Sequence, residues 1–109
     1  MGDRDRRVVV VRPGMPPVVE EIEGFDGARR VIGGIVQYLP MGRWACLCDQ
    51  DRVAKGLPPN RRVNGDMIHG PFVVTRLTPG DLEALSEAEA ERFVRELSEP
   101  GASGARDPS

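Results

Sequence analysis

The stretch VVVVRPGMPPVVEEI, residues 8–22, decides the kind of fold that this chain adopts. Its first segment, 8–12, is rich in β-branched valine, which favours a strand, and Pro13-Gly14 is a turn pair that ends it. The second segment, 18–22, starts with two more valines and continues into two glutamates. We therefore predict two strands that are joined by a turn and fold back on each other.

A short helix is predicted next, over the segment GFDGARRVIGG, residues 24–34. Asp26 is of the type that caps a helix N-terminus, and Gly33-Gly34 can end the helix because glycine adopts left-handed conformations at little cost. A helix of about two turns is marginal in isolation, so tertiary packing of Val31 and Ile32 must hold it.

The C-terminal part of the chain has the clearest helix signals. Ser86 and Glu89 have the spacing of a capping box, and the apolar residues after them recur at helical spacing, at 90, 93, 94 and 97. We predict a helix over residues 87–98. A short helical turn is also predicted over residues 79–84, because Thr78-Pro79 resembles a helix start and Leu77 and Leu82 have the spacing of a hydrophobic staple.

Further strands are predicted over residues 35–39 (IVQYL), 43–48 (RWACLC) and 71–77 (PFVVTRL). Residues 58–66 (PPNRRVNGD) are predicted to be a loop, because paired prolines disfavour a helix and a central strand and Asn64-Gly65 is a strong turn pair. These patterns predict the α+β class. A small, mainly antiparallel sheet packs against a C-terminal amphipathic helix and one short helix.

The predicted core consists of apolar side chains from every strand and both helices. They are Val9, Val11, Val19, Ile22, Val31, Ile32, Ile35, Tyr38, Trp44, Cys46, Leu47, Phe72, Val74, Phe93 and Leu97.

The length and composition of the chain predict a single domain. A chain of 109 residues with 39% hydrophobic residues has room for one domain with a modest core. Residues 1–6 and 99–109 hold almost no large apolar side chain, so we expect both ends to be disordered and residues 7–98 to form a single globular domain.

Charge and cysteine usage narrow the function classes. Residues 1–77 have a net charge of +3 and residues 78–109 a net charge of −5, so the chain lacks the overall basic field of a nonspecific nucleic-acid binder. Cys46 and Cys48 lie two residues apart on a strand, which predicts buried thiols rather than a disulfide or a metal site. No segment has the length of a signal peptide or a transmembrane span, so we expect no membrane and a cytoplasmic location.

Three motifs, in this order, resemble one known family: VIGG at 31–34, LPPNR at 57–61 and IHGPF at 68–72. Together they resemble domain-of-unknown-function family 3846, over roughly residues 8–97. Members of that family are small proteins or modules that are common in bacteriophages and mobile elements of bacteria. The resemblance implies an accessory protein in a bacterial cytoplasm and implies no catalytic residues or cofactor.

The best candidate for a binding site is the basic, proline-stiffened segment and its neighbours. Its predicted residues are Arg52, Lys55, Asn60, Arg61, Arg62 and His69. Guanidinium groups on an ordered loop suit the recognition of carboxylate or phosphate. The partner would be a host protein or a small anionic ligand. Alanine at both Arg61 and Arg62 is expected to leave the fold intact and to remove binding.

Two other functions stay open. The first is a small enzyme with a polar cleft around Asp49, Asn60, Arg61 and His69, which requires these side chains to converge on one substrate. The second is weak nucleic-acid binding through the arginines, which would depend steeply on salt and is disfavoured by the acidic C-terminal helix. Sheet edges favour pairing, so a homodimer is a further expectation.

Overall fold

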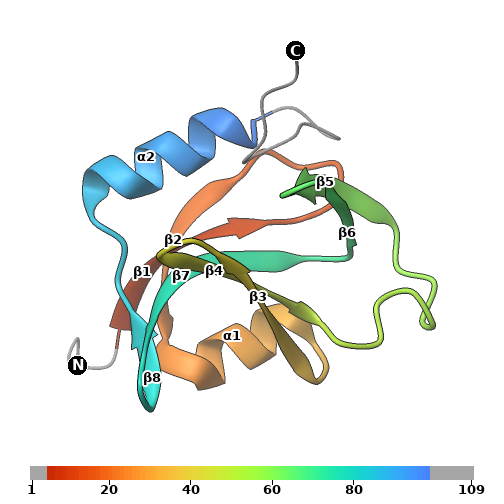
Figure 1. Ribbon diagram of the computed structural model, residues 1–109, viewed down its shortest axis with the longest axis horizontal. Helices are drawn as coiled ribbons and strands as arrows, with labels where there is room; N and C mark the ends of the chain where they lie inside the picture. The colour runs from red at the N-terminus through yellow and green to blue at the C-terminus, as the bar shows by residue number, and fades with distance from the viewer. Residues whose placement is uncertain (1–4, 99–109) are drawn as a thin grey trace.

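The computed structural model describes residues 5–98, which form a fold of strands and two helices (Figure 1). In chain order, the elements are β1 (Asp5–Val11), β2 (Val18–Glu23), α1 (Gly24–Ile32), β3 (Val36–Met41), β4 (Trp44–Asp49), β5 (Pro59–Val63), β6 (Asp66–His69), β7 (Phe72–Thr78), β8 (Asp81–Glu83) and α2 (Glu87–Glu96). The predicted α+β class is confirmed. The predicted disordered tail, residues 99–109, lies outside the described residues.

Strand β7 organises the main sheet. The strand order is β2-β1-β7-β4-β3, all neighbours are antiparallel, and β8 pairs with the C-terminal end of β7. The N-terminal half of β7 is bonded on both edges, because Val74 lies opposite Val9 of β1 and also opposite Cys46 of β4. Strands β5 and β6 form a separate hairpin.

The valine run of β1 is buried on both faces of the sheet. Val9 and Val11 pack in a core with α2, whereas Val8 and Val10 pack in a second core with α1. Figure 1 shows the two helices on opposite sides of the sheet. A strand that is covered on both sides has no solvent-facing position to fill with a polar residue, which explains four consecutive valines.

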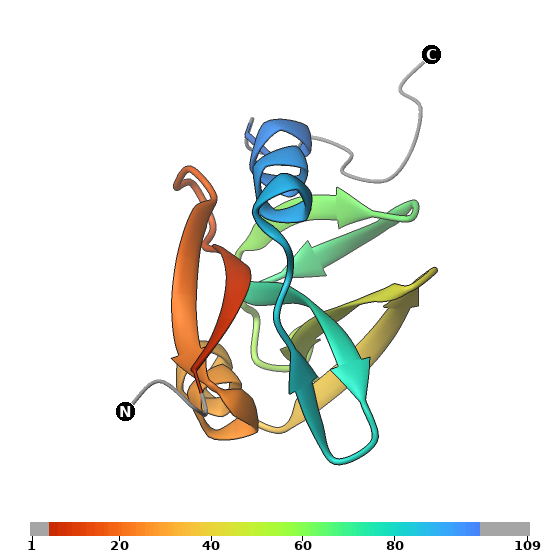
Figure 2. The ribbon, with the colours of Figure 1, turned by 90° about the vertical axis from the view of Figure 1, so that its left-hand side faces the viewer.

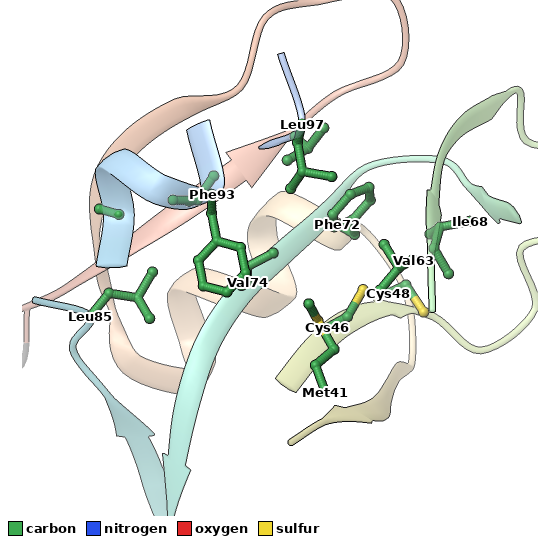
Figure 3. Packing of buried hydrophobic residues seen from close by; sticks show 13 residues of the cluster. Met41, Cys46, Cys48, Val63, Ile68, Phe72, Val74, Leu85, Phe93 and Leu97 are labelled. Atoms are coloured by element: carbon green, nitrogen blue, oxygen red, sulfur yellow. The ribbon is translucent and has the colours of Figure 1, made fainter. Parts of the chain in front are cut away.

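The core beneath α2 joins the main sheet to the β5–β6 hairpin (Figure 3). Its labelled side chains come from β3, β4, β5, β6, β7, the connection before α2, and α2 with the residue after it: Met41, Cys46, Cys48, Val63, Ile68, Phe72, Val74, Leu85, Phe93 and Leu97. Cys46 and Cys48 share this face and are fully buried, free thiols, so their predicted burial on one side of a strand is confirmed.

Residues 58–66 are a hairpin rather than the predicted loop. Pro59 is the first residue of β5, a position where the missing N–H does not interrupt a ladder, so the proline pair did not exclude a strand. The predicted Asn64-Gly65 turn is confirmed. Both residues have positive φ values, 51° and 87°, as a two-residue hairpin turn requires.

The predicted helical turn over residues 79–84 is also wrong. The segment forms the turn and second strand of the β7–β8 hairpin, with Gly80 at φ 94°. Leu77 and Leu82, which have the spacing of a hydrophobic staple, lie opposite each other across the two strands. The same apolar pair can therefore close a hairpin as well as a helix end.

The predicted ends of the two helices are confirmed in part. The capping box of α2 is confirmed, because Glu89 N donates to Ser86 Oγ at 3.1 Å and Ser86 N donates to Glu89 Oε1 at 2.8 Å. The helix ends at Glu96, two residues before the predicted end. Helix α1 ends at Gly33 as predicted, but Asp26 lies in its first turn and does not cap it.

Three predicted core residues are exposed: Val19, Ile35 and Tyr38 are 47%, 61% and 43% accessible. Val19 and Tyr38 lie on the two edge strands, β2 and β3, and Ile35 lies in the connection that leads into β3. Ordered structure also begins earlier than predicted. Strand β1 starts at Asp5, because Arg6 pairs with Ile22 of β2 and its Nε donates to the carbonyl of Leu82.

Candidate functional site

Asn60, a predicted binding residue, lies inside the protein. Its side chain is 3% exposed, and its Nδ2 donates to the carbonyl oxygens of Val11 and Gly70, each at 2.9 Å. These acceptors lie at the end of β1 and just after β6. Asn60 therefore ties the β5–β6 hairpin to the main sheet, and its amide has no free donor for a ligand.

Arg61 is fully buried, and its guanidinium is bonded to oxygen atoms of the protein itself. Its Nε donates to the carbonyl of Leu97 at 3.0 Å, its Nη2 to the carbonyl of Met15 at 2.7 Å, and its Nη1 to Asn60 Oδ1 at 2.8 Å. Burial lowers the pKa of this group. The expectation that Arg61 extends from a surface loop is corrected, because a helix end and the β1–β2 turn enclose it.

Arg52 and Lys55 gather around Asp49 at the end of β4. Lys55 Nζ donates to Asp49 Oδ2 at 2.6 Å, and Arg52 Nη1 donates to the Asp49 carbonyl at 3.0 Å and to Gln37 Oε1 at 2.6 Å. The hydrogen bond from Lys55 lowers the pKa of Asp49, and a bond from the backbone N–H of Asp51 adds to this, whereas burial opposes it. These bonds fix the connection between β4 and β5.

The last two predicted residues lie on the β5–β6 hairpin and face different partners. Arg62 is exposed, and within the described part of the chain its side chain forms one hydrogen bond, from Nη1 to the carbonyl of Gly65 at 3.4 Å. His69 Nδ1 lies 3.1 Å from the carbonyl of Leu57. Among the described residues, no side-chain bond joins Asp49 or His69 to Asn60 or Arg61, so the cleft that an enzyme would need is not formed by direct contacts between these four groups.

A pocket of about 390 Å³ lies elsewhere, where β4 and β7 separate. Their pairing ends at Ala45 and Thr75, and Figure 2 shows the β3–β4 and β7–β8 hairpins diverging beyond this point. The pocket is lined by Tyr38, Pro40, Gly42, Arg43, Trp44, Ala45 and Leu77. Ala45 also belongs to the core beneath α1, so the pocket continues that core to the surface.

Exposed apolar side chains line this pocket. Tyr38 is 43% and Leu77 41% accessible, although both are large hydrophobic residues. The Tyr38 ring is held edge-on against Phe25 of α1, with ring centroids 5.9 Å apart. Helix α1 therefore forms one boundary of the apolar surface and leaves the rest uncovered. The sequence predicted Tyr38 in the core and Leu77 in a hydrophobic staple, so neither residue was expected to line a surface pocket.

Trp44 forms the side of the pocket toward α2 and is fixed there by several contacts. Its Nε1 donates to Glu89 Oε2 at 2.9 Å, and its ring packs edge-on against Phe93. The capping bond from the Ser86 backbone lowers the pKa of Glu89, and the Trp44 bond and the Arg76 charge act in the same direction. The pocket wall is thus part of the network that starts α2.

Arg43 provides the charge of the pocket. It is exposed, its guanidinium carbon lies 5.8 Å from the centre of the Trp44 ring, and no carboxylate within residues 5–98 pairs with it. Nearby arginines differ in this respect. Arg92 pairs with Glu96 at 2.8 Å, and Arg76 lies 3.7 Å from Glu89. The pocket therefore combines apolar walls with one cation that is available to an anionic group.

A sequence profile described as "Domain of unknown function (DUF3846)" matches residues 6–98. The chain belongs to this family of unknown function. No curated protein and no solved structure matches the chain. Neither helix in the described part is long and apolar enough to cross a membrane. Across residues 5–98 there is also no group of three or more His, Cys, Asp or Glu side chains that could hold a metal ion.

Replacing Arg61 by alanine is expected to lower the free energy of unfolding by at least about 3 kcal/mol. The substitution removes the donors to the carbonyl oxygens of Leu97 and Met15 and to Asn60 Oδ1, and it opens a cavity where a fully buried side chain was. Urea unfolding midpoints measure this change. Arg62→Ala, one position along β5 and exposed, is the matched control and should change stability by less than about 0.5 kcal/mol. Similar effects of the two substitutions would contradict the structural role of Arg61.

The stability that Asp49 contributes is expected to depend on pH. Its pKa in the folded protein lies below the unfolded value of about 3.9, so its contribution is complete above about pH 4 and is lost as the pH falls through the folded pKa. The difference in unfolding free energy between the wild type and Asp49→Asn should therefore be larger at pH 7 than at pH 3. A difference for Asp49→Asn that stays constant between the two pH values would refute the assignment.

Proposed function

We propose that the protein acts by binding a partner protein, and that the pocket between the β3–β4 and β7–β8 hairpins is the binding site. The observation that carries this proposal is the combination of two exposed apolar side chains, Tyr38 and Leu77, with a cation, Arg43, that pairs with no carboxylate of residues 5–98. Grouped exposed apolar side chains beside a polar group are typical of recognition surfaces.

The partner group that fits this site is an apolar side chain close to a carboxylate. Tyr38, Pro40, Ala45 and Leu77 can cover an apolar side chain, and Tyr38 offers contact area at a low cost in conformational entropy. The Arg43 guanidinium can hold a carboxylate with two parallel hydrogen bonds. Tyr38 is 43% and Leu77 41% accessible, so the pocket walls present exposed apolar area, which favours a protein partner over a small anionic ligand.

Binding rather than catalysis is supported by how the polar side chains are used. Arg61, Asn60, Lys55 and Arg52 all bond to other groups of the protein. Of the binding residues predicted from the sequence, only Arg62 is exposed with a single, long hydrogen bond, and it therefore remains the alternative anchor for a partner.

The biological setting remains the one that the family resemblance implies. An accessory protein of a bacteriophage or mobile element, active in the bacterial cytoplasm, commonly works by occupying a host protein. A small binding domain with one apolar, singly charged recognition pocket is suited to that mode of action.

Selection from a random peptide display library on the immobilised full chain tests this function. Enriched peptides should carry an apolar residue near Asp or Glu, and Leu77→Asp should abolish their binding, since it puts a charge among apolar walls. Arg43→Glu should weaken binding at least about tenfold by placing like charges together. Fluorescence polarisation measures the affinities.

Arg62→Glu is the matched control for Arg43→Glu, because both replace an exposed arginine by an acid. It should leave peptide affinity within about twofold of wild type, the scatter expected of a substitution away from the site. The proposal fails if no peptide is enriched or if binding survives Leu77→Asp. Loss of binding in Arg62→Glu together with retention in Arg43→Glu would move the site to the β5–β6 hairpin.

A further inference from the structure

The two edges of the main sheet differ in a way that bears on how a partner binds. Strand β2, at one edge, has the sequence VVEEIE and carries three glutamates. Strand β3, at the other edge, has the sequence VQYLPM and carries no charge. Charged residues on an edge strand prevent another strand from adding to it, so β2 is protected and β3 has only Pro40 for this purpose.

Pro40 protects only one end of β3. Its carbonyl accepts a hydrogen bond from Asn64 Nδ2 at 3.2 Å, so the turn of the β5–β6 hairpin covers the edge there. The preceding residues, 36–39, pair with β4 on one side and with no strand of the described chain on the other. Tyr38, in the middle of this stretch, lines the pocket, which makes the free edge and the pocket one continuous surface.

We propose that the partner is an extended, acidic peptide segment that adds to the sheet as a strand along residues 36–39 of β3. This inference rests on the proposed function, because it uses the same pocket. Backbone hydrogen bonds to β3 provide affinity, the pocket takes one apolar side chain, and Arg43 takes a carboxylate. Main-chain pairing with side-chain pockets is a general mode of peptide recognition.

The strand geometry fixes the spacing of the two recognised residues. Successive side chains of a strand point to opposite faces of the sheet, and every second side chain points to the same face. Pro40 lies opposite Ala45, and Tyr38 is two residues from Pro40 on the same strand, so these three pocket residues share one face of the sheet and the apolar residue of the partner must lie on that face. An acidic residue that reaches Arg43 from the same face is therefore expected an even number of positions from the apolar residue, whereas a spacing of three would indicate a bound helix.

A scan of N-methylated peptides tests the strand. In an added strand, only alternate residues point their N–H groups at β3, so methylation of every second residue should weaken binding about tenfold or more and methylation between them should not. The scan uses the peptide enriched on the wild-type chain, so no protein variant has to fold. If methylation does not weaken binding at alternate residues, the proposal that the peptide adds to the sheet as a strand is overturned.

Amide hydrogen exchange supplies the second readout. Peptide binding should slow exchange at outward-facing amides within residues 36–39, while amides of β2, the other edge, exchange as before. Slower exchange on β2, or none on β3, overturns the inference. So does a dimer, seen by sedimentation without peptide, in which residues 36–39 are already protected, because a second copy then occupies the edge.

The scan and the pocket variants separate the two proposals. If Leu77→Asp abolishes binding but the effect of N-methylation does not alternate along the peptide, the pocket remains the binding site and the added strand is rejected. If the effect of N-methylation alternates along the peptide but binding survives both Leu77→Asp and Arg43→Glu, the pocket is not the site of recognition and the proposed function is rejected.

Discussion

The central strands of this protein are apolar on both faces, and that constraint sets the rest of the architecture. Four consecutive valines in β1 and the run from Phe72 to Val74 in β7 leave no side of the sheet for water. Both faces must then be covered, and residues 5–98 contain two short helices that contribute to this. On one face, α2 shares the task with the β5–β6 hairpin. On the other, the nine residues of α1 cover part of the sheet, and the pocket lies where that cover ends.

The β5–β6 hairpin can cover one face of the main sheet because its buried polar side chains form hydrogen bonds with other groups of the protein. Asn60 and Arg61 direct their donors to carbonyl oxygens of β1, the β1–β2 turn, the residue after β6 and the end of α2. A buried guanidinium without a carboxylate is tolerable when neutral oxygens and the negative end of a helix surround it. Asn60 and Arg61 thus connect parts of the fold, whereas Arg43, in the two-residue turn between β3 and β4, is exposed.

Local patterns in the sequence were sufficient for much of the fold. The β1–β2 hairpin, the Asn64-Gly65 turn, the capping box of α2 and the shared face of Cys46 and Cys48 all depend on residues within a few positions of each other. The site was not predictable in this way. The carbonyl groups that accept hydrogen bonds from Arg61 belong to residues 46 and 36 positions away in the sequence. The local sequence around an arginine therefore does not reveal whether its guanidinium is bonded to water or to a buried carbonyl. The exposure of Tyr38 depends on strand order, which no local pattern contains.

The bond from Arg61 to the carbonyl of Leu97 also constrains when the fold can be completed during synthesis. Strand β1 is made first, yet its partner β7 is more than sixty residues away, and β5 holds a guanidinium whose acceptor is near the other end of the described chain. Until residue 97 has been synthesised, Arg61 lacks one of its carbonyl acceptors. The apolar side chains of the β5–β6 hairpin also lack the contacts of the core that they share with α2. Folding is therefore expected to be slow, as is typical of topologies dominated by long-range pairing.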